Sequence, residues 1–217
     1  MSAFKGSVKS SSGGDGEYVA ELPEADTHPA VVCALVDLGT HSKRKFQSDE
    51  VEDVHLVLIG YQLADRKSDG TPHVLMQEMR LSYHVKSMLY WVACKLMKRK
   101  PGEGEAIDYA ALVGLPASVT VSHGKTAKGK DYARIDDVGG LGRGMTPPKP
   151  DRVVCWSRGD DPSALDWLPY HFGKPVAEHV ELCVENTGNR AAQANGGGAR
   201  TAVPNHHNNI KDMEEVF

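Results

Sequence analysis

The feature that most constrains the fold is the run of residues 54–63, VHLVLIGYQL. Most of its side chains are apolar, and Val, Ile and Tyr are residues that favour β-strands. The run follows a group of acidic residues and precedes the turn pair Asp69-Gly70. It is the strongest strand signal in the chain. Because the apolar side chains are so dense, we expect a strand that is buried on much of both faces.

Four further strands are predicted by similar criteria. They are rich in β-branched residues or alternate between apolar and polar side chains, and turn residues separate them. Their expected ranges are 30–36, 73–81, 117–123 and 131–138.

One helix is predicted between the third and fourth of these five strands. Ser87 is a favourable N-cap, and an apolar stripe follows it at helical spacing. Basic residues 98–100 are expected in the last turn, where the helix dipole favours positive charge, and the pair 101–102, Pro-Gly, ends the helix. The stripe consists of Leu89, Val92, Ala93 and Leu96.

The predicted order is therefore strand, strand, strand, helix, strand, strand. This order is typical of a mainly β fold, the five-stranded oligonucleotide-binding (OB) Greek-key barrel, with one helix between strands 3 and 4. In such barrels the loops between strands 1 and 2 and between strands 4 and 5 contact the ligand. An SH3-like fold or another small α+β domain is the alternative.

Composition divides the chain into four parts. Residues 1–27 are rich in Ser, Gly and charge and are expected to be flexible, whereas 28–138 would form the OB domain. Residues 139–185 are interpreted as an extension that wraps the barrel, with an aromatic stretch at 166–172 that can dock on the same chain or on a second copy, as in a homodimer. Residues 186–217 are expected to be a disordered tail with an acidic tip.

Composition also excludes several classes of protein. There is no apolar run of the roughly 18 residues that a membrane span requires, and the first residues lack the apolar core of a secretory signal. The four cysteines form no C-x-x-C pair, which argues against a zinc ribbon and a disulfide framework. We therefore expect a cytoplasmic protein with free thiols, which makes no contact with a membrane.

The sequence offers little that resembles a catalytic site. Gly124-Lys125-Thr126 is similar to the end of a phosphate-binding loop, but Val119 stands where that loop needs a glycine. The glycines of 139–144 are not followed by a predicted helix, so a dinucleotide site fails on context. The ten histidines are scattered along the chain. We expect neither an enzyme nor a bound metal or cofactor.

Charge and aromatic residues favour a nucleic-acid ligand. The net charge is −4, yet residues 28–150 carry 17 Lys and Arg against 14 Asp and Glu, so a mildly basic centre lies between acidic ends. Cations interleaved with aromatic rings suit single-stranded nucleic acid, because cations neutralise phosphates and rings stack on bases. The candidate contacts are Lys43, Arg44, Lys45 and Phe46 in the first loop, Lys125, Lys128, Lys130, Tyr132 and Arg134 around the second, and Tyr61 and Arg80 on the strands.

The end of the chain predicts a site for a protein partner. A free carboxylate, a cluster of negative charge and an apolar ring could all be captured by one basic pocket. The same tip could occupy the protein's own basic groove until a polyanion displaces it. The residues concerned are Asp212, Glu214, Glu215 and Phe217.

Together these features resemble the single-stranded DNA-binding proteins of bacteria and tailed bacteriophages. The stretch 28–40 with Phe46, and the sequences 112–114 and 128–132, also resemble small phage proteins of replication and recombination modules. The resemblance implies coating of single-stranded DNA without strong sequence preference. It also implies that the acidic tip recruits replication or recombination proteins, such as a polymerase, helicase or recombinase.

Two other classes stay open. The chain could be a phage virion or interaction protein, or an inhibitor of a host DNA-processing enzyme, with no DNA binding of its own. A nuclease or an accessory recombinase is the third possibility. The DNA-binding hypothesis requires that segments 43–45 and 125–130 face one continuous channel and do not point to opposite sides of the molecule.

Overall fold

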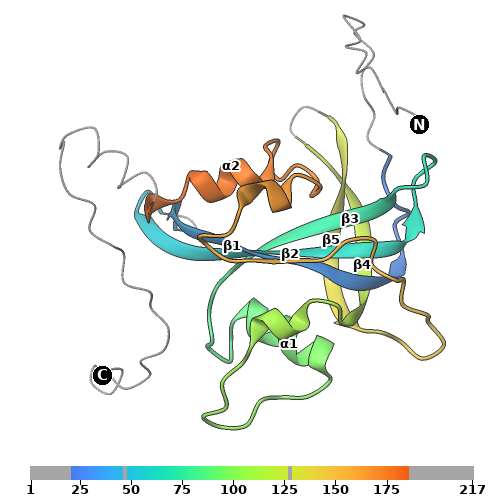
Figure 1. The fold of residues 1–217 in the computed structure, drawn as a ribbon, viewed down its shortest axis with the longest axis horizontal. Helices are drawn as coiled ribbons and strands as arrows, with labels where there is room; N and C mark the ends of the chain where they lie inside the picture. The colour runs from blue at the N-terminus through green and yellow to red at the C-terminus, as the bar shows by residue number, and fades with distance from the viewer. Residues whose placement is uncertain (1–20, 46–47, 127–128, 186–217) are drawn as a thin grey trace, which may run out of the picture.

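The computed structural model describes residues 21–45, 48–126 and 129–185. The chain is mainly β, as predicted, and forms one six-stranded sheet in the order β3-β2-β1-β4-β5, with β6 pairing in parallel to β1 and all other pairs antiparallel (Figure 1). The strands are β1 Thr27–Arg44, β2 Val51–Arg66, β3 Pro72–Arg80, β4 Pro116–Lys125, β5 Asp131–Gly140 and β6 Val154–Trp156. The helices are α1 Met88–Met97 and α2 Val176–Glu181, with short 3-10 turns η1 Tyr109–Leu112 and η2 Pro162–Leu165.

The sheet does not close into a barrel, so this part of the prediction is wrong. β3 and β5 are the two edges of the sheet, and among the described residues no ladder of hydrogen bonds joins them. A closed barrel buries only its inner face, whereas β1 and β2 bury both of their faces. The second face is covered from outside by the segment after β6, and His171 of that segment contacts Glu78 on β3.

Two apolar cores lie on opposite faces of β1 and β2. Alternate residues such as Val32 and Ile59 face the core that contains α1, whereas Cys33 and Leu58 face a second core built with β6, η2 and α2. Figure 1 shows α1 below the sheet and α2 above it. The burial of the 54–63 run on both faces is therefore confirmed, and the extension 139–185 forms the cover of the second face.

β1 is much longer than the strand predicted over 30–36. The pair 39–40, Gly-Thr, does not end the strand. A bulge at Leu38 shifts the register against β2 between Asp37 and Gly39, and pairing continues from Gly39 onward. Gly39 has φ +78°, a conformation that glycine adopts without steric cost. The strand therefore continues to Arg44 and forms, with β2, a long two-stranded ribbon.

Helix α1 begins as predicted, and it ends earlier than predicted. The backbone N–H of Tyr90 donates a hydrogen bond of 3.1 Å to Oγ of the N-cap Ser87. The helix ends at Met97, and Lys98 forms the cap with left-handed backbone, φ 55°. The basic residues 98–100 therefore lie beyond the last turn. None of the helices in the described part of the chain is long and apolar enough to cross a membrane.

Candidate nucleic-acid interface

A groove of about 1020 Å³ lies between the two edge strands of the open sheet. Its walls come from three parts of the chain that are distant in sequence: β3, the end of β4 with β5, and the segment before α2. Both charged and aromatic side chains line it. The lining residues are Leu75, Met76, Gln77, Glu78, Lys125, Thr126, Tyr132, Ala133, Arg134, Ile135, Tyr170, His171, Phe172 and Gly173.

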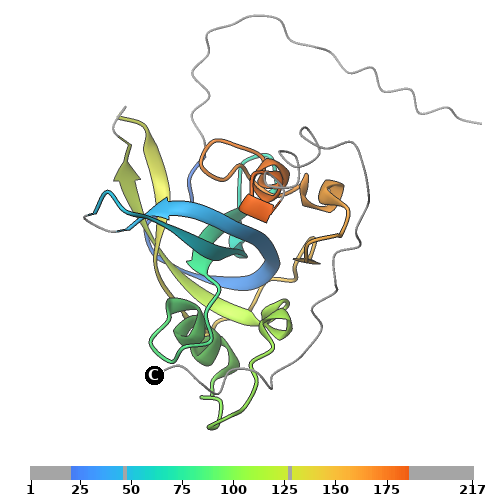
Figure 2. The ribbon, with the colours of Figure 1, turned by 90° about the vertical axis from the view of Figure 1, so that its left-hand side faces the viewer.

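The two basic segments approach one groove through Lys43 and Lys125. The β1–β2 connection and the β4–β5 hairpin both lie toward the left in Figure 2, whereas Figure 1 shows the first at the left end of the sheet and the second rising above it. Lys43, near the end of β1, forms an ion pair with Glu78 of the groove, whereas Lys125 lines the opposite wall. Lys43 and Lys125 therefore do not point to opposite sides of the molecule, since one contacts a residue of the groove and the other lines it.

The β5 wall carries the predicted alternation of side chains. Tyr132 and Arg134 are exposed, whereas Ala133 and Ile135 are partly buried against the α1 core. Tyr132 is 40 % exposed, and its ring lies over Gly124 on the paired strand β4. A Cβ added at Gly124 would lie 2.7 Å from Cζ of Tyr132, so the missing side chain makes room for the ring.

The β3 wall is organised around one carboxylate. Glu78 accepts hydrogen bonds from Lys43 and from Nε2 of His171, the latter at 3.4 Å. Burial alone would raise the pKa of Glu78, but the bonds from His171 and Lys43 outweigh it and lower the pKa to about 2. Glu78 is therefore ionised at neutral pH. It fixes the end of β1 and the segment before α2 to the edge of β3.

Five other predicted cations have carboxylate partners among the described residues. Lys125 pairs with Asp131 at 2.7 Å, and Arg134 pairs with Asp136 at 2.8 Å. Outside the groove the pairs are Arg44 with Asp49 at 3.5 Å, Lys45 with Glu50 at 2.7 Å and Arg80 with Glu52. Lys130 is exposed at the start of the β4–β5 ladder and does not line the groove. Since these pairs are exposed, each contributes little to stability and a phosphate can compete for the cation.

Tyr61 is the clear exception among the predicted contacts. Its side chain is fully buried in the α1 core, with 0 % exposure, and its hydroxyl donates a long bond of 3.5 Å to Oε1 of Gln77. Burial raises the pKa of Tyr61 above its ordinary value. The interpretation of Tyr61 as a stacking residue is therefore wrong, because its ring packs in the core and is not accessible to a base.

Several predicted contacts lie outside the described residues. Phe46 and Lys128 belong to the two short internal stretches outside the described ranges. The partner-binding residues of the acidic tip, Asp212, Glu214, Glu215 and Phe217, also lie outside them. Their roles stay predictions.

Two exposed aromatic residues of the groove are absent from the contacts predicted from the sequence. Tyr170 and Phe172 line the groove and are 71 % and 77 % exposed. The aromatic stretch 166–172 is predicted to dock on a surface, and Trp167 and Leu168 do pack against the second core. Gly173 signals a turn, but no local signal in the sequence shows that the ring of Phe172 is exposed.

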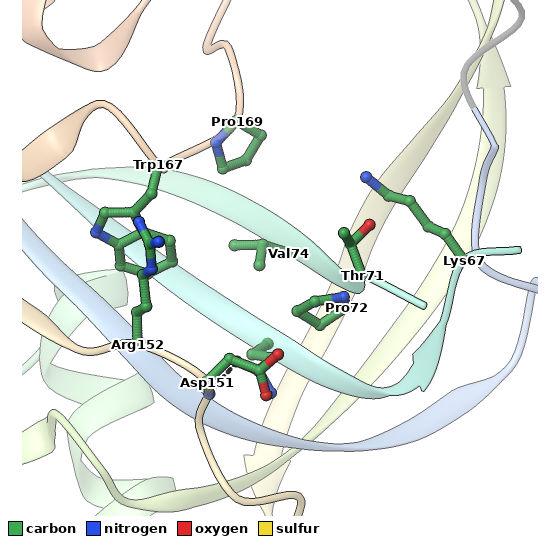
Figure 3. Close-up of a pocket in the computed structure, with 9 residues that line it drawn as sticks. Lys67, Thr71, Pro72, Val74, Asp151, Arg152, Trp167 and Pro169 are labelled. Carbon is green, nitrogen blue, oxygen red and sulfur yellow. Dashed lines mark hydrogen bonds between the residues drawn. The ribbon is translucent and has the colours of Figure 1, made fainter. Parts of the chain in front are cut away.

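A second cavity of about 470 Å³ lies between the start of β3, the residues before β6 and the stretch 167–169 (Figure 3). Its lining includes Lys67, Arg152 and Trp167, together with Gln62 and Asp151, which bond to each other. Asp151 accepts hydrogen bonds from Gln62 and Arg66, and its own N–H donates to Oε1 of Gln62 at 2.8 Å. None of the predicted contact residues within the described ranges lines this cavity, so the groove between β3 and β5 is the stronger candidate.

Within residues 21–45, 48–126 and 129–185, no group of three His, Cys, Asp or Glu side chains is placed to hold a metal ion. All four cysteines are free, and Cys155 is the exposed one. The sequence matches no protein-family model and no curated protein. Function is therefore inferred from the geometry of the groove and from the residues themselves.

Proposed function

We propose that this protein binds single-stranded DNA in the groove between β3 and β5, as a phage-type coating protein of replication or recombination. The observation that carries the proposal is the groove itself, which brings Lys125, Tyr132 and Arg134 together on one wall of an open sheet edge. Cations beside exposed rings are what sequence-tolerant binding of a flexible polynucleotide requires. A duplex is a poorer ligand, because its bases are already stacked and paired.

The strand order also supports this proposal. In the order β3-β2-β1-β4-β5, with a helix between β3 and β4, the chain has the arrangement expected of an OB barrel whose seam between β3 and β5 is open. OB barrels are partly open and bind oligonucleotides with the loops that correspond here to the β1–β2 and β4–β5 connections. We therefore interpret the sheet as an opened OB fold.

The electrostatics favour weak, salt-sensitive binding. The cations along the groove already have carboxylate neighbours, as Lys125 has Asp131 and Arg134 has Asp136. A bound phosphate must compete with these carboxylates as well as with salt ions. Affinity should therefore fall as salt rises, with a slope that reflects a small number of phosphate contacts.

The test is a titration of labelled oligo(dT), followed by fluorescence anisotropy, at low and moderate salt and against duplex of the same length. We expect binding of the single strand at low salt and weaker binding of the duplex. Arg134→Ala should reduce the affinity, whereas the matched control Arg99→Ala, which removes an arginine paired with Glu105 away from the groove, should not. No binding of oligo(dT) at low salt would overturn the proposal and favour the interaction-protein alternative.

The acidic tip is proposed as the handle for a replication or recombination protein. Deletion of residues 208–217 should leave or raise the affinity for oligo(dT), because negative charge that can compete for the groove is removed. The same deletion should abolish capture of a polymerase, helicase or recombinase in a pull-down. Unchanged capture by the truncated chain would contradict this role.

A further inference from the structure

The segment before α2 contains a tight turn with an aromatic residue at its tip. His171 and Lys174 form an antiparallel bridge, with N–H···O bonds of 2.8 Å and 3.1 Å between them. The two central residues, Phe172 and Gly173, have φ +48° and +79°. Positive φ at both central positions defines a type I′ turn, which favours Asn-Gly or Gly-Gly. We call residues 171–174 the aromatic turn.

Phe172 is unfavourable at this position for two reasons. Left-handed backbone is sterically strained for a bulky residue that has a Cβ. In addition, its ring is 77 % exposed, so the strain is not repaid by burial in either core. Among the described residues other than glycine, Lys98 is the second one with a positive φ, and it caps the C-terminus of α1. Phe172 does not cap a helix.

The base of the aromatic turn is fixed while its tip is exposed. His171 is buried, and its ring contacts Glu78 of β3 and packs against the ring of Phe172 with centroids 4.2 Å apart. The carbonyl of His171 also accepts a bond of 2.6 Å from Nε2 of His179 on α2. The ring of Phe172 is therefore presented from a rigid support, which lowers the entropy cost of binding a ligand there.

The aromatic turn lies in the same groove as the cations. Phe172 and Tyr170 line the groove together with Tyr132, Lys125 and Arg134 from the other wall. Exposed rings close to cations fit bases that are attached to a phosphate backbone. An apolar protein surface would use the rings but not the neighbouring charges.

We propose that Phe172, together with Tyr170, forms a base-stacking platform that is held in a strained turn for that purpose. This inference rests on the proposed function and assigns a residue-level binding site to a part of the chain outside the five-stranded core. It explains why the chain keeps a phenylalanine where asparagine or glycine would fit the backbone better.

The test compares Phe172→Asn with the wild-type chain in oligo(dT) titrations and thermal unfolding. Asn tolerates left-handed backbone and creates the preferred turn pair with Gly173, so the midpoint of unfolding should rise by about 2–4 °C. The affinity for oligo(dT) should fall about tenfold, the usual size of one lost base–ring stack. The dependence of affinity on salt should keep its slope, because no phosphate contact is removed.

Three controls distinguish the loss of a base–ring stack from a general loss of binding. Phe172→Trp should retain the affinity. An abasic oligonucleotide of equal length should bind wild type and Phe172→Asn equally, because it has the phosphates but no bases. Tyr83→Ser removes an exposed ring that does not line the groove, and it should leave the affinity unchanged. If the wild type binds oligo(dT) and Phe172→Asn binds equally well, the stacking platform is wrong and the DNA-binding proposal stands; if the wild type does not bind, the DNA-binding proposal itself fails.

Discussion

At the scale of single residues, the groove is defined by cations that share their charge with neighbouring carboxylates. Lys125 is 2.7 Å from Asp131, and both side chains are exposed, so a phosphate and Asp131 compete for the same ammonium group. We predict that Asp131→Asn raises the affinity for oligo(dT) about threefold at low salt, as expected for one exposed charge. Anisotropy titration measures this change. Glu105→Gln, which removes the partner of Arg99 away from the groove, is the control and should have no effect.

Gly124 gives a second prediction at this scale, because the ring of Tyr132 occupies the space that a side chain would need. In Gly124→Ala the ring must move, and its position in the groove is lost although the tyrosine is still present. We expect the affinity for oligo(dT) to fall in the same direction as in Tyr132→Ala, by about two- to tenfold. Gly139→Ala, on the same pair of strands, meets Oγ of Ser118 at 3.1 Å instead and should leave the affinity unchanged. Equal affinities for Gly124→Ala and the wild type would contradict the role of Tyr132.

At the scale of elements, the bulge in β1 allows α2 and the residues after it to dock on the sheet. A Cβ at Gly39 would lie 2.9 Å from Cβ of Cys183, and the φ of +78° is strained for any other residue. We predict that Gly39→Ala lowers the free energy of unfolding by about 2–4 kcal/mol, from the strain and the clash together. Gly70→Ala has the same strain, φ +81°, with nothing within 4 Å, so it should cost only about 1–2 kcal/mol. The free energies of unfolding of both variants are measured with urea. The difference between them gives the cost of the clash with Cys183, because the backbone strain is common to both.

The elements also show how far the sequence alone determines the fold. The strand over 54–63 and the N-cap Ser87 are predictable, because dense apolar content and capping chemistry are local signals. The length of β1 is not predictable in this way. The pair Gly39-Thr40 is equally compatible with a turn that ends the strand and with a bulge after which the strand continues. The burial of Tyr61 is not a local property either, since it depends on the helix that packs against the strand. The groove requires the two edge strands β3 and β5 to face each other, and that arrangement depends on the order and curvature of the whole sheet.

At the scale of the whole molecule, the sheet is a middle layer and not the wall of a barrel. One face is covered by α1, and the other by the segment that runs from β6 through α2. This second cover is also what carries Tyr170 and Phe172 to the groove. Core and binding surface are therefore coupled: whatever loosens the cover should displace the aromatic turn as well.

Two carboxylates attach this cover to the sheet, and they predict how the molecule responds to acid. Glu78 holds His171 and Lys43, and Glu185 accepts bonds from the N–H and Oγ1 of Thr40 and pairs with Arg158 at 3.2 Å. In both cases burial would raise the pKa, but these bonds and charges outweigh it and lower the pKa to about 2. A carboxylate with a lowered folded-state pKa stabilises the fold above its ordinary pKa, and this contribution is lost as pH falls toward 2.

We therefore predict that the free energy of unfolding, measured with urea, decreases between about pH 5 and pH 2, by on the order of 2 kcal/mol for Glu78. Glu78→Gln should be less stable than the wild type at pH 7, and the two should converge as the pH approaches 2. Glu103→Gln, which replaces an exposed carboxylate between α1 and η1, is the control and should follow the wild-type curve. Because Glu78 attaches the cover to the sheet, pepsin at about pH 4, where Glu78 is still ionised, should cleave within residues 157–185 more readily in Glu78→Gln than in the control. Parallel curves for Glu78→Gln and the wild type over this pH range would show that Glu78 does not hold the cover in place.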